Sequence, residues 1–372
     1  MGKIRCYTAD LDEASRCITQ LQNAAVSSEF VIVSKPNDTT MLLNRNQLSS
    51  WAMNTFSAGK HLFGVNQINS YTVAVASYPL ANKVGVEFNV NFMAGPKAIN
   101  DLRCTCSVIA RDLLNQMGPS ATFTDKLFAT QNFFRRQFEY RDSGQSKAHS
   151  ATDLLRSGSG VCQAIATMAT ILLPFLEVPC LYISGEGFSG SEWGPHGWNA
   201  VKMPEGQWIY IDFTFGLNSI LFPPSTINKT ASKRFLKNHK WDTDRHSEES
   251  LEHALSRITE INATAFTIRP NKQIFSMDGI TVSAGRQVLR TDGEGYSIDL
   301  VFLFRMVGGG AEYIPDRDRL HFVLYDKQAY IDSASAFMNE DGTFDIRILN
   351  ALPISYSFSD QGIKIRLGGE DE

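Results

Sequence analysis

Several features are missing from the sequence, and each absence excludes a class of protein. No apolar run is long enough to cross a bilayer, because the longest candidates are interrupted by Pro174 or by charged residues. Basic residues are not in excess, since the formal net charge is −4 at pH 7, so we expect no nucleic-acid partner. No apolar segment follows Met1, so we expect no signal peptide and a cytoplasmic protein, unless a leader has been removed.

Cysteine is too sparse and too irregularly spaced for a disulfide scaffold or a zinc site. The chain has 372 residues and six cysteines, none in a CxxC pair. We therefore expect no metal ion and no other cofactor, and we interpret five of the six as small buried apolar residues. The six are Cys6, Cys17, Cys104, Cys106, Cys162 and Cys180.

The composition and the residue patterns predict an α+β protein with three parts. Hydrophobic residues make up 43% and charged residues 20%, which is typical of globular proteins. Residues 1–118 have a mixed α/β pattern, and residues 119–262 are expected to form the catalytic core. Residues 263–372 contain turn signals between strand-like runs and no expected helix, with 296–306 as one strand. This last part is predicted to be an antiparallel β-sandwich or a small barrel.

Cys162 is the cysteine whose position indicates chemistry. It follows a glycine-rich stretch, 156–160, and begins a helix that is apolar nearly all round as far as Pro174. Unpaired backbone N–H groups and the positive end of a helix stabilise a thiolate, and they can also stabilise an oxyanion on the attacked carbonyl. A small apolar residue suits the same position, so a cysteine there needs partners before it indicates catalysis.

Two further residues supply candidate partners. His196 is bounded by Pro195 and Gly197 at the start of a strand, where its ring has room for a substrate, although taken alone it is more simply a structural histidine bonded to a backbone carbonyl. Asp212 lies in an otherwise apolar strand, which costs free energy unless the carboxylate is paired or hydrogen-bonded. Orienting an imidazole would account for it, and so would capping a neighbouring loop.

The loop between these two strands decides whether the partners can meet. If residues 204–206 form a three-residue loop, Met203 pairs with Gln207 and Trp198 lies opposite Asp212. His196 is then diagonal to Asp212 on the same face and within hydrogen-bonding reach. A two-residue turn would place them on opposite faces.

Three blocks of this sequence together resemble the transglutaminase-like superfamily, in particular its bacterial members. The blocks include Gly160-Val161-Cys162-Gln163-Ala164, then Gly194-Pro195-His196-Gly197-Trp198-Asn199, then Trp208-Ile209-Tyr210-Ile211-Asp212. They follow the family's order, and residues 234–242 resemble the segment that often comes after the core. The resemblance covers about residues 120–250.

The resemblance implies a papain-like fold with a catalytic triad. Cys162 would be the nucleophile, His196 the general base and Asp212 its orienting partner. We expect a thiol-dependent acyl-transfer enzyme, a cysteine protease or amidase that cleaves peptide or amide bonds through a thioester. Its substrate would be a protein, a peptide or a peptidoglycan-like amide. A protein-glutamine transglutaminase is the alternative, and a binding protein that retains the fold without turnover is another.

The accessory residues of the site are less clearly indicated. Many bacterial members have an aromatic residue where this chain has Thr152, so the oxyanion donor is expected to be Thr152 or Gln163, with Gln145 as a substitute. Trp193 and Trp198 are assigned to substrate binding.

A polar run at 239–248 contains His and Asp residues that could hold a divalent metal. Its lysine and arginine, and the lack of a known ligand spacing, favour a solvated loop instead.

Overall fold

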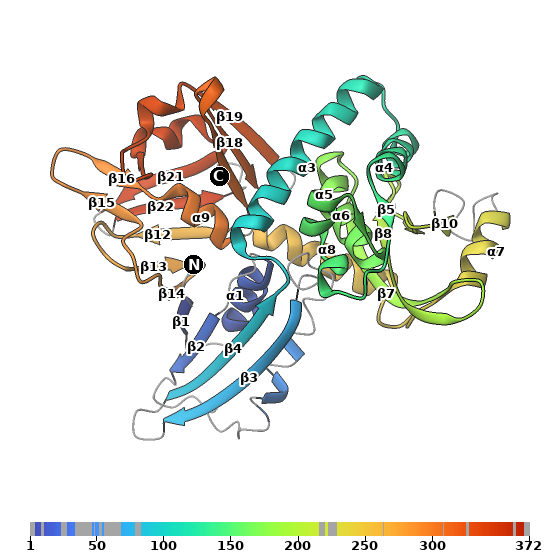
Figure 1. Cartoon of the computed structure of the whole chain (residues 1–372). Helices are drawn as coiled ribbons and strands as arrows, with labels where there is room; N and C mark the ends of the chain where they lie inside the picture. The colour runs from blue at the N-terminus through green and yellow to red at the C-terminus, as the bar shows by residue number, and fades with distance from the viewer. Residues whose placement is uncertain are drawn as a thin grey trace.

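The structure is a computed structural model, and it describes most of the chain. The described residues are 4–8, 11–23, 28–33, 47, 49–51, 54–55, 68–78, 83–215, 220–221, 229–262, 264–307, 309–324, 327–359 and 362–367. Within these ranges, no helix combines the length and the apolar composition needed to cross a membrane. Figure 1 shows a β-rich half and an α/β half, with helix α3 (Pro96–Met117) running between them.

The largest sheet joins the two ends of the chain. Its nine described strands have the order β21-β22-β12-β13-β14-β1-β2-β4-β3, with β1 parallel to β2 and antiparallel to β14. Strands from the expected first and third parts therefore share one sheet, and the boundaries expected at 118 and 263 stay predictions. The strands are β1 (Ile4–Thr8), β2 (Ser28–Val33), β3 (Ile68–Tyr78), β4 (Lys83–Phe92), β12 (Ala265–Ile268), β13 (Ile274–Met277), β14 (Ile280–Ser283), β21 (Ile354–Ser359) and β22 (Gly362–Leu367).

The C-terminal part is rich in antiparallel strands, as expected, but it also contains helix α9 (Leu300–Met306). Helix α1 (Leu11–Asn23), from the N-terminal part, packs with residues of the C-terminal part in one buried hydrophobic cluster. Two smaller sheets of three described strands each share a buried hydrophobic cluster with the large sheet. They consist of β15 (Leu289–Thr291), β16 (Tyr296–Ile298) and β20 (Phe344–Asp345), and of β17 (Gly310–Ile314), β18 (Arg319–Leu324) and β19 (Lys327–Asp332).

The strand expected over 296–306 is wrong beyond residue 298. Helix α9 (Leu300–Met306) follows β16, and the Asp299 carboxylate caps it by accepting a 3.0 Å hydrogen bond from the Phe302 N–H. Six of the seven residues of α9 are apolar, so periodicity alone does not distinguish a buried helix from a buried strand. Asp299 was the available signal for a helix start.

The α/β half is built on a second antiparallel sheet, with the described order β10-β9-β8-β7-β11. Its two faces belong to different clusters of buried residues: Val201 and Ile209 pack with helix α6 (Cys162–Phe175), whereas Trp198 and Ala200 pack with Phe235. The strands are β7 (Cys180–Phe188), β8 (Trp193–Lys202), β9 (Trp208–Ile211), β10 (Ile220–Leu221) and β11 (His239–Lys240).

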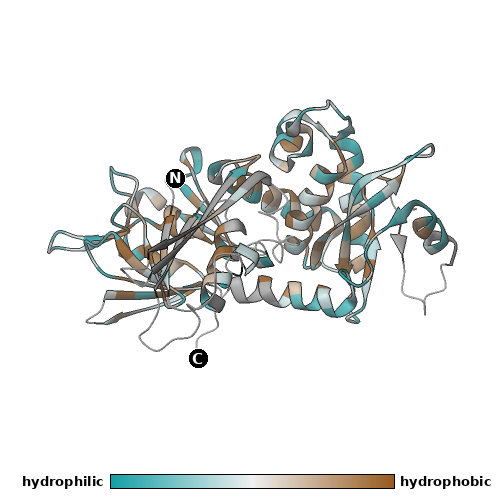
Figure 2. Ribbon diagram, turned by 90° about the horizontal axis from the view of Figure 1, so that it is seen from below, coloured by the Kyte–Doolittle hydropathy of each residue, from teal (hydrophilic) through white to brown (hydrophobic). Residues whose placement is uncertain are grey.

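Helices cover both faces of this sheet, and Figure 2 shows hydrophobic segments gathered inside both halves of the molecule. The side chain of Thr122 and the carboxylate of Asp125 form a capping box at the start of α4. The Gln131 amide at the middle of α4 donates a 3.1 Å hydrogen bond to the Phe213 carbonyl, just beyond β9. The remaining elements are α4 (Phe123–Gln137), β5 (Glu139–Tyr140), α5 (Ala151–Ser157), β6 (Ser159–Gly160), α6 (Cys162–Phe175), α7 (Lys229–Asn238) and α8 (Glu248–Asn262).

Candidate active site

Cys162 is the first residue of α6, as the sequence predicts. The preceding Val161 is extended, with φ −107° and ψ 178°, and no side chain caps this helix end. A Cβ on Gly160 would lie 3.0 Å from the Ala148 carbonyl oxygen, so a side chain at this position would crowd the approach to Cys162. The Asn199 amide on β8 donates a 2.9 Å hydrogen bond to the Ala166 carbonyl, which holds α6 against the sheet. The thiol thus lies at the positive end of a fixed helix, beside N–H groups that can stabilise negative charge.

The loop between β8 and β9 has the length on which the triad depends. The Met203 N–H donates to the Gln207 carbonyl at 2.8 Å, which closes a three-residue loop whose Gly206 has φ +91°. This left-handed conformation suits glycine. The observed register of β8 with β9, continued by one pair, places Trp198 opposite Asp212. The observed pairs, from Lys202 with Trp208 to Asn199 with Ile211, have the register that the three-residue loop predicts.

The predicted hydrogen bond between the imidazole and the carboxylate is also present. The Nε2 of His196 lies 2.7 Å from Oδ2 of Asp212, whose side chain is fully buried. The other carboxylate oxygen, Oδ1, accepts a 2.8 Å bond from the Thr214 N–H. His196 also forms a side-chain hydrogen bond with Cys162. The three predicted residues therefore form one hydrogen-bonded chain, Cys162–His196–Asp212.

The hydrogen bonds and charges within the Cys162–His196–Asp212 group shift the pKa values of His196 and Asp212 in opposite directions. Burial lowers the pKa of His196, but its hydrogen bonds to Asp212 and Cys162 and their negative charges outweigh burial and raise it to about 10. Burial raises the pKa of Asp212, but hydrogen bonds from His196 and His239 outweigh burial and hold it at about 2. The carboxylate is therefore ionised and the His196 imidazolium is favoured at neutral pH.

Glycines on the neighbouring strand β7 make room for the imidazole. A Cβ on Gly187 would lie 2.8 Å from Cγ of His196. A Cβ on Gly185 would collide with the Lys240 carbonyl and with the Trp198 ring. These glycines are not among the site residues predicted from the sequence. The strand β7 extends through both glycines, and glycine inside a strand often marks a close approach, so this pair of glycines was the available signal.

Trp198 packs against the imidazole rings of the site and is not exposed to solvent. Its side chain is 0% exposed, and its ring lies 5.9 Å from that of His196 and 4.9 Å from that of His239. The expected contact of Trp198 with substrate is therefore incompatible with its burial. Trp193 is half-buried, and the Lys240 ammonium lies 3.9 Å from its ring centroid. Its role in substrate binding stays a prediction.

The expected oxyanion donors have other partners. The Thr152 hydroxyl lies 2.8 Å from the Ser150 hydroxyl, and Oε1 of Gln163 lies 3.1 Å from Nδ1 of His149. Their assignment to the oxyanion stays a prediction. A residue that was not predicted from the sequence forms a side-chain hydrogen bond with the nucleophile.

That residue is Tyr140, whose strand β5 pairs with β6 immediately before Cys162. Burial raises the pKa of the Tyr140 hydroxyl, and the charge of Cys162 and a hydrogen bond with it raise the pKa further. Tyr140 as a whole is 54% exposed, so its side chain is both near the thiol and open to solvent. Proximity to a helix-start cysteine through strand pairing is not visible in sequence spacing.

The first residue of the polar run at 239–248 contacts the site, and later residues of the run form a turn. His239 at its start contacts Asp212, with Nε2 3.0 Å from Oδ2. Farther along, Oδ1 of Asp242 accepts bonds from the N–H groups of Asp244 and Arg245 and so caps a turn. Among the described residues, His196, Asp212 and His239 bring ligand-type atoms within 4.8 Å of one another. These atoms already bond to each other through the shared Oδ2.

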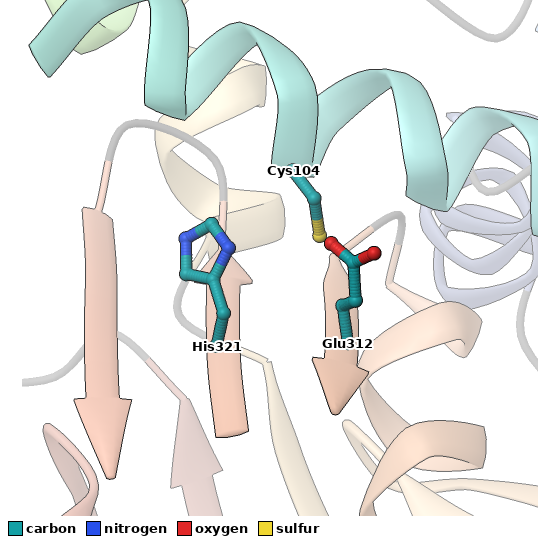
Figure 3. A group of neighbouring side chains, drawn as sticks. All are labelled: Cys104, Glu312 and His321. Atoms are coloured by element: carbon teal, nitrogen blue, oxygen red, sulfur yellow. The ribbon is translucent and has the colours of Figure 1, made fainter. Parts of the chain in front are cut away.

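A second cluster of such side chains lies at the joint between the two halves. Figure 3 shows the sulfur of Cys104 on α3, the carboxylate of Glu312 on β17 and the imidazole of His321 on β18 facing a common centre. Burial raises the pKa of Cys104 to about 12 and lowers that of His321 to about 4, so thiol and imidazole are neutral at neutral pH. The cations Arg103 and Arg305 act on the same thiol and disfavour a divalent metal. The ion pair that makes a cysteine nucleophilic is absent from this cluster.

Comparison with known proteins identifies a family for the segment that contains Cys162, His196 and Asp212. Residues 111–213 match the sequence profile of the transglutaminase-like superfamily. None of the curated proteins is detectably similar in sequence.

Three solved structures show similarity at low identity. A TGase aligns with 63% of this chain and 66% of its own, at 11% identity and a TM-score of 0.29. A proposed cysteine protease from Cytophaga hutchinsonii aligns with 39% of this chain and 62% of its own, at 15% identity and a TM-score of 0.25. A proposed protease from Parabacteroides distasonis aligns with 50% of this chain and 39% of its own, at 9% identity and a TM-score of 0.23. At least a third of each solved chain is thus unmatched. By its sequence profile, the segment 111–213 belongs to the transglutaminase-like superfamily.

Proposed function

We propose that this protein is a thiol-dependent acyl-transfer enzyme, a cysteine peptidase or amidase that acts on peptide or amide bonds. The observation that carries the proposal is the continuous hydrogen-bonded chain from Cys162 through His196 to Asp212 at the first turn of α6. Because Asp212 is ionised and fully buried, it can stabilise an imidazolium at His196. That imidazolium in turn stabilises the Cys162 thiolate.

The first half of the reaction forms a thioester. The thiolate of Cys162 attacks the carbonyl carbon of the amide, and the electron pair of the C=O bond moves to oxygen. The uncapped N–H groups at the start of α6 and the Tyr140 hydroxyl can donate hydrogen bonds to this oxyanion. When the C–N bond breaks, the His196 imidazolium gives its proton to the leaving amine.

The second half releases the acyl group. Neutral His196 accepts a proton from water as the water oxygen attacks the thioester carbonyl. The C–S bond breaks, the acid leaves, and the imidazolium–thiolate pair returns. Transglutamination shares the thioester and differs only in that an amine replaces water.

The test is cleavage of a peptide and amide library by the protein and by a Cys162→Ala variant. We expect cleavage by the protein and a loss of at least about 1,000-fold in the variant, because no other group supplies the thiolate. A Cys180→Ala variant is the matched control, since Cys180 is also buried and burial raises the pKa of its thiol. Equal turnover in the protein and its Cys162→Ala variant would refute the proposal. Incorporation of a labelled primary amine into protein glutamines, with no cleavage, would favour the cross-linking alternative.

A further inference from the structure

His239 is held rigidly against the carboxylate of the triad. It lies on β11, which pairs with β7 opposite Gly187, and its side chain is fully buried. The Phe235 ring stacks on the imidazole with centroids 3.9 Å apart and planes 7° apart. The Trp198 ring meets it edge-on at 4.9 Å. With aromatic rings on two sides, the imidazole cannot turn without disrupting the core.

Both ring nitrogens of His239 face groups that can only accept a hydrogen bond. Nδ1 lies 2.9 Å from the Phe235 carbonyl oxygen, and Nε2 lies 3.0 Å from Oδ2 of Asp212. A carbonyl oxygen and an ionised carboxylate have no proton to donate, so each nitrogen must carry its own. The contacts around His239 are therefore those of an imidazolium.

We propose that His239 is a positioning residue, a doubly protonated imidazolium that holds Asp212 in place and balances its charge within a Cys162–His196–Asp212–His239 chain. This inference rests on the proposed function, since it assigns a role in the same site. The thiolate and the carboxylate alternate with the two imidazolium groups, so the buried chain has no net charge. A buried carboxylate with one cationic partner would be less well compensated.

The second imidazolium also affects the first. Both rings donate to the same oxygen, Oδ2 of Asp212, and their centroids are 5.6 Å apart. Like charges at this distance repel, so His239 limits the basicity of His196. This matters for turnover, because His196 must release its proton to the leaving amine. The neighbouring cation on β11, Lys240, has its ammonium over the Trp193 ring.

Two variants separate positioning from charge. His239→Gln keeps an N–H donor near the place of Nε2 but removes the charge, whereas His239→Leu removes both. His246→Gln is the matched control, because His246 is a buried histidine of the same segment. The measurements are the pH dependence of Cys162 alkylation by iodoacetamide and ¹⁵N–¹H spectra of the side chains of the seven histidines.

In the unaltered protein we expect both nitrogens of His239 to be protonated at neutral pH. His239→Gln should raise the titration midpoint of His196, because a repelling charge is removed. His239→Leu should slow Cys162 alkylation about 10- to 100-fold, the effect of losing a charge-assisted hydrogen bond to the orienting carboxylate. His246→Gln should change neither quantity.

A neutral His239 with one protonated nitrogen would overturn the inference, and so would a His239→Gln variant with the His196 midpoint of the control. If His239→Leu does not fold, the spectrum of the unaltered protein and the His239→Gln variant still decide. Alkylation and spectra need no substrate. Failure of the proposed function would instead appear as absent amide cleavage by the unaltered protein with these readouts intact.

Discussion

Replacing Asp212 by asparagine tests the role of the buried carboxylate that bonds to His196 and His239. Oδ2 of Asp212 accepts hydrogen bonds from His196 and His239, and Oδ1 accepts one from the Thr214 N–H. Asparagine has a single acceptor oxygen. If that oxygen keeps the bond to Thr214, the amide NH₂ faces two imidazole N–H groups, and both of those hydrogen bonds are lost.

The expected loss follows from these contacts. A hydrogen bond to a charged group contributes about 1.5–3 kcal/mol, so losing two costs about 3–6 kcal/mol. At about 1.4 kcal/mol per factor of ten, this predicts a fall in turnover of about 10²- to 10⁴-fold. Asp212 is fully buried and cannot touch substrate, so KM should change little while kcat falls. The fold should persist, because the bond to Thr214 is kept.

The same change should alter the pH dependence of stability. In the unaltered protein the pKa of His196 is raised from 6.5 to about 10, so the stabilisation is complete below about pH 6.5 and lost as the pH rises through about 10. In Asp212→Asn the carboxylate that contributes to this rise is gone, and the pKa of His196 should fall toward its ordinary value. Stability should then depend much less on pH in this alkaline range.

The measurements are kcat, KM and the free energy of unfolding in urea at a series of pH values. Asp242→Asn is the control, because Asp242 is exposed and asparagine can still cap its turn. Undiminished kcat in Asp212→Asn, or a His196 titration still near pH 10, would refute the reasoning.

Two further predictions follow from the fold. Gly187→Ala should displace the His196 ring, because the new Cβ would lie 2.8 Å from its Cγ, and should lower kcat at least about 10-fold. Gly194→Ala is the control, because nothing lies within 4 Å of its new Cβ, and it should leave kcat unchanged. Equal kcat values in the two variants would contradict the prediction. A fragment of residues 93–262 should unfold cooperatively by itself, as measured by circular dichroism. In a fragment of residues 1–262, β1 loses its partner β14, so protease should cleave the first 92 residues rapidly. A protease-resistant 1–262 fragment would show that the first part is stable without β14.

Local sequence determined much of the candidate site. Cys162 could be placed at a helix start because a glycine-rich stretch precedes an apolar helix, and both features lie within a few residues. The opposition of Trp198 and Asp212 followed from the length of one loop, because strand pairing across a tight loop is a local geometric rule. The family resemblance rested on the same blocks and matched the segment 111–213.

The tertiary structure alone decided which distant residues complete the site. His239 reaches Asp212 from 27 residues farther along the chain, and no local periodicity encodes that contact. The same holds for Gly187, whose missing side chain matters only because β7 lies beside His196. Strand β1 pairs with β14 across most of the chain length, so composition and turn signals could not place the two ends in one sheet. Such partners are selected by burial and packing of the whole chain, and these become defined only when the chain folds.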